Sequence, residues 1–139
     1  MQPLTQTHPV SKKTLWASYL MTALPVLMLL FSAIMKFLKP QSVLEGFAHL
    51  GLPASLALGL GILELSCTVV YMIPRTSVLG AILLTGYLGG AIATHLRVGD
   101  PLFSHVLFPT YVAALLWAGL LLRNARLRAL LFLTPSPAQ

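Results

Sequence analysis

Apolar side chains occur along this chain in four long, unbroken runs separated by short polar segments. The runs cover residues 15–37, 53–73, 78–96 and 101–122. Each holds 19 to 23 residues, and an α-helix of that length crosses about 30 Å of hydrocarbon. Apolar and polar positions do not alternate within the runs as they would in the strands of a membrane barrel. The pattern therefore predicts four transmembrane α-helices.

The connections between the runs predict how the helices are arranged. Residues 74–77 and 97–100 are so short that consecutive helices must lie antiparallel. The predicted fold class is therefore an all-α membrane protein with an up-down four-transmembrane-helix bundle over residues 14–123. The first connection, residues 38–52, is longer and predicts an interfacial turn or short helix. Asp100 and Pro101 predict the start of the fourth helix, with Asp100 as its N-cap and paired with Arg97.

The two ends of the chain differ in character from the predicted bundle. Residues 1–13 are polar and predict a cytoplasmic tail. In residues 124–139, Arg126 and Arg128 are interspersed with leucines before a proline-containing end. This second pattern predicts a short interfacial helix on the inner membrane surface, followed by a tail.

Composition supports a membrane protein and excludes other classes. Hydrophobic residues make up 57% of the 139 residues and charged residues only 9%, whereas a soluble domain carries about 25% charged residues. A disordered chain is excluded as well, because disordered segments are poor in apolar residues. The net charge of +6 comes from bases that flank the apolar runs and form no patch. We therefore expect a lipid bilayer as the partner of this surface and no nucleic acid.

The distribution of bases predicts the orientation in the membrane. Six bases fall on the side of the N-terminus and three on the opposite side, which also contains Glu45 and Asp100. Because cytoplasmic segments carry the excess of Lys and Arg, both termini are predicted to be cytoplasmic. The six are Lys12, Lys13, Arg75, Arg123, Arg126 and Arg128, and the three are Lys36, Lys39 and Arg97.

Glu64 is the acidic residue that the pattern places in the middle of the bilayer. A carboxylate there costs several kcal/mol unless it is neutral or paired. Tyr87 and Tyr111 fall at a similar depth, whereas Lys36 lies roughly 15 Å nearer the outer edge. Hydrogen bonds from a tyrosine are therefore expected, because an ion pair with Lys36 would need strongly tilted helices. Three roles remain open for Glu64. It binds a ligand or relays protons, it locks helices together as a neutral group, or it faces lipid.

A second group of polar residues is predicted at the outer rim. His95 and His105 both fall within about 6 Å of the outer edge, on the same side as Arg97 and Lys36. These side chains can donate hydrogen bonds to a quinone carbonyl, an anion or a lipid headgroup, or can serve only as interfacial anchors. Two histidines without a third ligand do not predict a metal site.

Small residues in the second and third runs suggest close helix packing. Gly86 and Gly90 form a GxxxG pair, with Gly89 beside them, and Ala57 and Gly61 form a similar pair in the second run. Small side chains let helix backbones approach closely. The alternative is that the glycines leave room for a flat ligand beside Tyr87.

Several motifs resemble the DoxX-like family of small bacterial integral membrane proteins. They are LGAILLTGYLGGAIATHLR at residues 79–97, followed by Asp100-Pro101 and Trp117, with FSAIMK at 31–36 and GILE at 61–64. Ala33 stands where many relatives have a glycine. The resemblance covers residues 16–128 and implies a four-helix, multi-pass protein of the bacterial inner membrane. Relatives include a subunit of a thiosulfate:quinone oxidoreductase, which implies a membrane redox partner and a quinone as a candidate cofactor, although the cofactor is unknown.

Three functions are compatible with these observations. The first is a redox-associated accessory subunit that binds a quinone or similar apolar molecule between its helices. The second is a non-enzymatic assembly or partner subunit in a membrane complex or homo-oligomer. The third, a small-molecule transporter, is disfavoured because four short helices without an internal repeat make a poor transporter. The sequence contains no complete catalytic constellation, so enzymatic activity of the chain alone is not expected.

Overall fold

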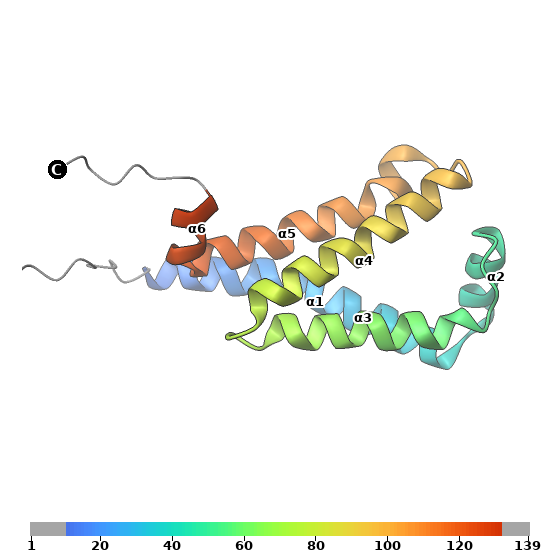
Figure 1. Ribbon diagram of the computed structural model, residues 1–139, viewed down its shortest axis with the longest axis horizontal. Coiled ribbons are helices and arrows are strands. Elements are labelled where there is room, and N and C mark those ends of the chain that lie inside the picture. The colour runs from blue at the N-terminus through green and yellow to red at the C-terminus, as the bar shows by residue number, and fades with distance from the viewer. Residues whose placement is uncertain (1–10, 132–139) are drawn as a thin grey trace, which may run out of the picture.

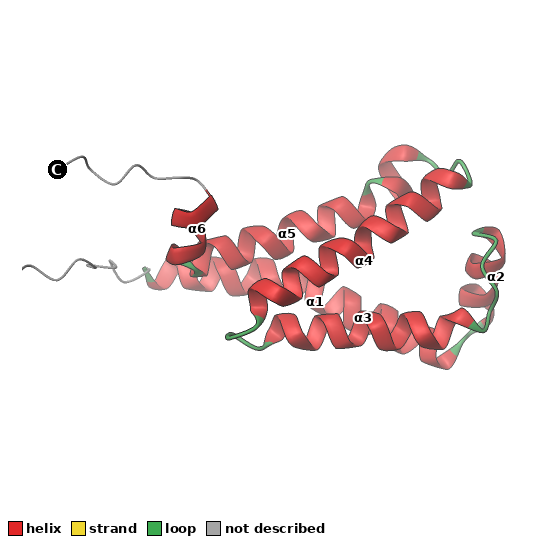
Figure 2. Ribbon diagram, in the orientation of Figure 1, coloured by secondary structure: helices red, strands yellow, loops and turns green. Residues whose placement is uncertain are grey.

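The structure, a computed structural model, describes residues 11–131, and these residues form helices joined by short loops (Figures 1 and 2). The predicted tail at residues 1–10 and the end at residues 132–139 lie outside the described residues. The elements in chain order are α1 (Lys12–Leu38), α2 (Gln41–His49), α3 (Leu56–Met72), α4 (Ser77–Arg97), the π-helix η1 (Leu102–Val106), α5 (Phe108–Arg123) and α6 (Ala125–Leu131).

Local sequence signals explain where the helices begin and end. Ser11 caps α1 by accepting a hydrogen bond from the backbone N–H of Thr14 at 3.3 Å. Lys39 ends α1 in the left-handed conformation, with φ of 49°, and Pro40 follows it. Gly51 and Gly99, with φ of 65° and 75°, turn the chain after α2 and α4. Glycine suits both turns because it adopts positive φ without a steric cost.

The helix boundaries lie within three residues of those predicted from the apolar runs. The fourth run differs, because Leu102–Arg123 is not one regular helix. Its first five residues form η1, and α5 begins at Phe108 with Pro109 in its first turn. The prediction that Asp100 caps a regular helix was wrong: no side-chain cap bond precedes η1, and the Asp100 carboxylate binds histidines instead.

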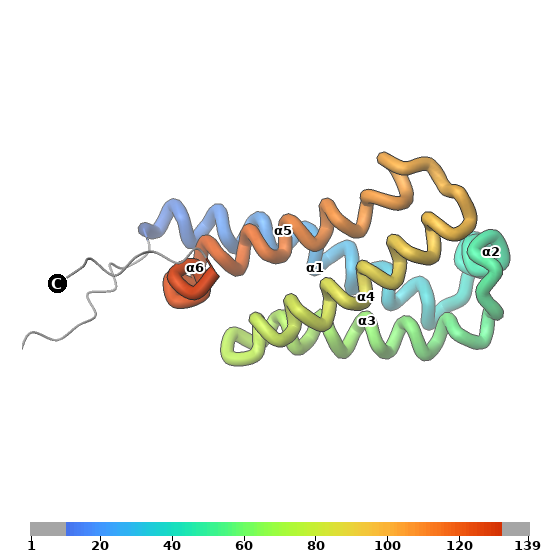
Figure 3. The backbone as a smooth tube through the Cα atoms, turned by 45° about the horizontal axis from the view of Figure 1, so that its top comes forward, coloured from blue at the N-terminus to red at the C-terminus, as the bar shows by residue number. Residues whose placement is uncertain are grey.

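Four helices pack side by side in a closed ring. α1 packs against α3 and α5, and α4 packs against the same two helices from the other side. We call the end with α6 and the α3–α4 turn the terminal end, and the opposite end the α2 end. At the α2 end, α2 joins α1 to α3, while α4 and α5 slope away from α3 (Figure 1). At the terminal end, α6 turns across the end of α5 (Figure 3).

Within residues 11–131, three segments are long and apolar enough to cross a membrane: Lys12–Leu38, Ser77–Arg97 and Leu102–Arg123. α3 is apolar but shorter, with 17 residues. Many large apolar side chains of the described residues face outward, including Trp16, Phe31 and Phe103. Such an exposed apolar surface is what a lipid environment requires, since lipid tails are as apolar as leucine.

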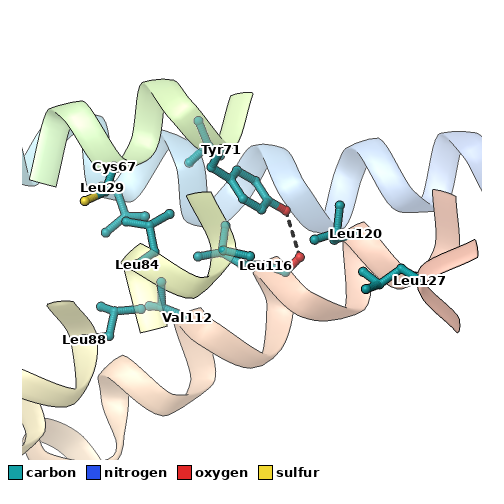
Figure 4. Packing of buried hydrophobic residues seen from close by; sticks show 11 residues of the cluster. Leu29, Cys67, Tyr71, Leu84, Leu88, Val112, Leu116, Leu120 and Leu127 are labelled. Atoms are coloured by element: carbon teal, nitrogen blue, oxygen red, sulfur yellow. Dashed lines mark hydrogen bonds between the residues drawn. The ribbon is translucent and has the colours of Figure 1, made fainter. Parts of the chain in front are cut away.

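The core lies toward the terminal end, where the helices approach one another most closely. Leu84 of α4 and Leu116 and Leu120 of α5 are fully buried there (Figure 4). Tyr71 of α3 is also fully buried, and its hydroxyl donates a hydrogen bond to the Leu116 carbonyl at 2.8 Å. The hydroxyl therefore has a partner inside the core, which removes the penalty for burying it.

Close helix contacts depend on three glycines. A Cβ at Gly80 would lie 2.3 Å from the Tyr71 backbone, and one at Gly119 would lie 2.3 Å from Oγ1 of Thr22. A Cβ at Gly61 would lie 2.8 Å from the Phe37 ring. Ala57, the other member of the predicted small pair on α3, is fully buried. Of these three positions, only Gly61 was among the small residues singled out from the sequence.

Candidate functional site

Toward the α2 end, the diverging helices line an apolar cavity of about 1150 Å³. α1, α3, α4 and α5 all contribute to its wall, and α2 covers one end with Val43 and Phe47. Phe47 is the buried residue of α2, so the cavity wall is also where α2 is anchored. A large apolar cavity with few polar groups is typical of a site for a small apolar ligand.

An ion pair is embedded in this apolar wall. Nζ of Lys36 lies 2.8 Å from Oε2 of Glu64, and the two side chains are only 16% and 3% exposed. Ser32 completes the group, because its hydroxyl donates to Oε2 of Glu64 at 3.2 Å and accepts from Nζ of Lys36 at 2.6 Å. A buried charge pair is stable only when such additional hydrogen bonds satisfy it.

The prediction that Lys36 lies beyond the reach of Glu64 was wrong, and side-chain direction explains the error. Side chains of an α-helix lean toward its N-terminus. α1 and α3 run antiparallel, so Lys36 leans away from the α2 end and Glu64 leans toward it. The bond from Lys36 to Ser32, four residues earlier, confirms this direction. α3 also begins three residues later than predicted, which brings Glu64 nearer the α2 end.

Part of the polar group remains available to a ligand. Oε2 of Glu64 accepts both hydrogen bonds, while Oε1 has no partner among residues 11–131. Every fully buried side-chain oxygen of the described residues has a hydrogen-bond partner. Because Oε1 has none, it is not fully buried, and Glu64 lines the cavity. Tyr87 lies beside Glu64 and lines the same cavity. The wall thus combines a cation, a carboxylate oxygen and a phenol hydroxyl.

A second polar cluster lies at the α2 end of the cavity. The Asp100 carboxylate accepts a hydrogen bond from Nε2 of His49 at 2.7 Å and from Nδ1 of His95 at 2.6 Å. Arg97 donates to the carbonyl of Leu50 just beyond α2, instead of pairing with Asp100 as predicted. These contacts tie α2 to the end of α4. His95 itself lines the cavity.

Hydrogen bonds determine the charge state of Asp100. The bonds from His95 and His49 lower the pKa of this carboxyl below its usual value, and they outweigh the opposing effect of burial. Asp100 is therefore an ionised carboxylate at neutral pH, and it can only accept hydrogen bonds.

Three of the predicted site residues, Arg97, Tyr111 and His105, are not part of the cavity wall. Tyr111 is 47% exposed, is not part of the cavity wall, and makes no hydrogen bond to Glu64. His105 is exposed in η1, bonded to Ser104 through Nδ1 at 2.8 Å. Its ring centroid lies 6.0 Å from that of His95, so it sits near the second polar cluster without entering the cavity.

The glycines of α4 border the cavity. Gly86 and Gly90 are part of its wall, and a Cβ at either position, or at Gly89, would meet no atom of the described residues within 4 Å. Within one chain these three glycines therefore make no close helix contact. Leu63, Ile82 and Leu83 line the same cavity and are also exposed. The cavity therefore reaches the apolar outer surface between α3 and α4.

The described residues contain no group of three or more His, Cys, Asp or Glu that could hold a metal ion. The polar groups of the cavity fit an organic head group better, because they combine donors with acceptors. A quinone head is compatible with this set: Lys36 and Tyr87 can donate to its oxygens while the apolar wall contacts its ring and tail.

Sequence reasoning missed Ser32 and the bridge formed by His49 and Asp100. Ser32 could have been found, because it lies four residues before Lys36 and so on the same helix face. The bridge has no such signal, since His49 and Asp100 are 51 residues apart and meet only through the placement of α2.

Comparison with known proteins identifies one family. The family model described as DoxX-like matches residues 20–119. This match includes Lys36, Glu64, Tyr87, His95 and Asp100. No curated protein and no solved structure matches the chain.

Proposed function

The chain belongs to the DoxX-like family, and we propose that it is a multi-pass protein of the bacterial inner membrane that binds a quinone or similar apolar molecule in its cavity. In this proposal it serves a membrane redox partner as an accessory subunit. A bound quinone supplies the electron transfer, and this chain's residues bind and orient the head group. The observation that carries the proposal is the Lys36–Glu64 pair in the wall of a large apolar cavity.

The proposed membrane topology has four spans. α3 is shorter than the other three segments, but 17 residues correspond to about 26 Å, at the lower limit of a spanning helix. Its packing against both α1 and α4 supports a place among the spans. Both termini are proposed to be cytoplasmic. The charge asymmetry is sharper than the sequence count suggested, because Lys36 is neutralised inside the protein by Glu64.

The Lys36–Glu64 ion pair is costly to bury, and a bound ligand accounts for its presence. Apolar residues of similar size would fill this place at least as stably, because desolvating two charges offsets much of their attraction. The cavity beside the pair is also unfilled by side chains of the described residues and opens to the apolar outer surface, so an apolar molecule can occupy it. Both features weaken a purely structural explanation and are accounted for by a ligand with a polar head.

The proposed route of access is from the bilayer. The cavity reaches the outer surface at Leu63, Ile82 and Leu83, and the bare backbone at Gly86 and Gly90 leaves that opening unobstructed. A molecule dissolved in lipid could enter there without crossing water, whereas α2 covers the end of the cavity. This route favours a membrane-soluble ligand.

The test is to extract and quantify the small molecules bound to the protein. Protein purified in mild detergent is extracted with organic solvent, and quinones are measured by mass spectrometry per mole of protein. We expect near-stoichiometric quinone in the wild type and a loss of at least tenfold in Glu64→Gln and Lys36→Met, each of which breaks the pair.

A matched pair of variants separates the site from general damage. Tyr87→Phe removes the hydroxyl beside Glu64, and Tyr111→Phe removes an exposed one outside the cavity. Retained quinone should fall in the first variant and stay unchanged in the second. Only bulk lipid in every sample, wild type included, would contradict the proposal.

A second candidate function is an assembly subunit, and Gly89 is the residue that favours it. Gly89 is exposed on α4, meets no neighbour within the described chain and is not part of the cavity wall. Such a surface could receive a helix of a partner or a second copy. Gly89→Leu should then abolish a crosslinked complex while quinone retention stays unchanged. An unaffected complex would exclude this face as the contact.

A further inference from the structure

Asp100 determines which nitrogen of His95 carries a proton. Nδ1 of His95 lies 2.6 Å from Oδ2 of Asp100, whose side chain is 8% exposed. The hydrogen bonds from His95 and His49 lower the Asp100 pKa, so the carboxyl is ionised and only accepts. The hydrogen of this short bond therefore resides on Nδ1.

The chemical character of the other ring nitrogen follows. In a neutral imidazole with its hydrogen on Nδ1, Nε2 is a hydrogen-bond acceptor. No described residue binds Nε2 of His95, and His95 lines the cavity. The side chain is 25% exposed and forms part of the cavity wall. A carboxylate that orients a histidine in this way is a common device in proteins.

The two polar positions in the cavity consequently differ in what they can bind. At the ion pair, Lys36 and Tyr87 can donate while Oε1 of Glu64 can accept, so that position accommodates either a carbonyl or a hydroxyl. At His95, the neutral ring presents only an acceptor. A carbonyl oxygen has no hydrogen to donate to Nε2, whereas a hydroxyl group does.

We propose that the Asp100–His95 pair makes the cavity selective for a ligand whose head carries a hydroxyl donor, such as a quinol or other phenol, over the carbonyl form. This inference rests on the proposed function and adds the chemical class of its ligand. Asp100 acts as a positioning residue, and His95 is the group that contacts the ligand. No electron transfer is part of the inference, because the selection concerns binding alone.

The experiment compares two ligands that differ only in the head group. An alkyl hydroquinone and the alkyl benzoquinone with the same chain are bound to the full-length protein in detergent, without oxygen, at pH 8, where free imidazole is neutral. Dissociation constants are measured by equilibrium dialysis. We expect the hydroquinone to bind the wild type about tenfold more tightly, as one hydrogen bond to a strong acceptor allows.

Variants separate positioning from mere packing. In Asp100→Asn the amide presents a donor as well as an acceptor, so it no longer holds the hydrogen on Nδ1 of His95. The ratio of hydroquinone to benzoquinone affinity should therefore fall toward one. His49→Ala leaves the Asp100–His95 bond in place and should keep the wild-type ratio. His95→Ala keeps Asp100 but removes the acceptor, and should weaken the binding of hydroquinone and not of benzoquinone. This variant tests the inference even if Asp100→Asn does not fold.

Each outcome has a defined meaning. A wild-type ratio near one, or a ratio unchanged in both Asp100→Asn and His95→Ala, overturns this inference while leaving the proposed function intact. Failure of both ligands to bind the wild type would instead overturn the proposed function, and this inference with it.

Discussion

Lys36 of α1 and Glu64 of α3 form an ion pair across two antiparallel helices, with Nζ and Oε2 separated by 2.8 Å. Each side chain leans toward the N-terminus of its own helix, so the two charges approach from opposite directions. Their charges are held in an apolar wall and satisfied by Ser32.

Breaking the pair from one side should destabilise the protein more than removing both charges. Lys36→Met leaves a buried carboxylate without its cation, which typically costs about 3–5 kcal/mol. The double variant Lys36→Met, Glu64→Leu should recover most of that loss, because no uncompensated charge remains. The free energy of unfolding in mixed micelles measures both. If the loss of unfolding free energy in the double variant equals the sum of the losses in the two single variants, the two charges do not interact in the native protein.

Gly80→Ala should disrupt the contact between α3 and α4. The new Cβ would lie 2.3 Å from the Tyr71 backbone, which cannot rotate away as a side chain can. Forcing the helices apart costs about 1–3 kcal/mol or more, measured as loss of unfolding free energy. Gly86→Ala is the control on the same helix, since its Cβ meets nothing within 4 Å of the described residues. Equal destabilisation by both would contradict the packing described for Gly80.

Tyr71→Phe should weaken the core at the terminal end without affecting the cavity. It removes the hydroxyl that donates to the Leu116 carbonyl from a fully buried side chain. The expected loss is about 1 kcal/mol of unfolding free energy. Tyr19→Phe, at a position 59% exposed, should change the unfolding free energy little. Quinone retention should be normal in both, and a loss in Tyr71→Phe would show that the two regions are coupled.

The attachment of α2 through Asp100 should be lost only in strong acid. The folded-state pKa of Asp100 lies below its unfolded value, which is about 3.9. Such a group contributes stability above the unfolded pKa and loses it as the pH falls through the folded pKa. The Tm advantage of the wild type over Asp100→Asn should therefore persist from pH 7 to about pH 4 and shrink below it. An advantage that vanishes between pH 7 and pH 5 would contradict this assignment.

The helical elements were predictable because the signal for them is local. A continuous apolar run in a chain with 9% charged residues must satisfy its own backbone hydrogen bonds, and helices do so within one segment. Boundaries followed from prolines, glycines and polar turns. The departure in the fourth run, where η1 precedes α5, was not predictable, because Pro101 and Pro109 signal irregularity without specifying its form.

The candidate site was predicted in part. Glu64, Tyr87, Lys36 and His95 were all selected from the sequence, and the structure brings all four to one cavity. Tyr111 was selected by the same depth argument and faces outward, since depth along a helix does not determine the face on which a side chain lies. Gly86 and Gly90 were expected either to pack helices or to leave room for a flat ligand, and within the described chain they border open space.

The sequence alone determined the helical class, the length of the apolar segments, membership of the DoxX-like family and the identity of the costly buried carboxylate. Each of these depends on composition, local spacing or motif. Only the tertiary structure decided the partners: Lys36 for Glu64, two histidines for Asp100, and a cavity where the glycines of α4 suggested a contact. Partner choice depends on helix direction, rotation and tilt together, and these arise from packing among residues far apart in the chain.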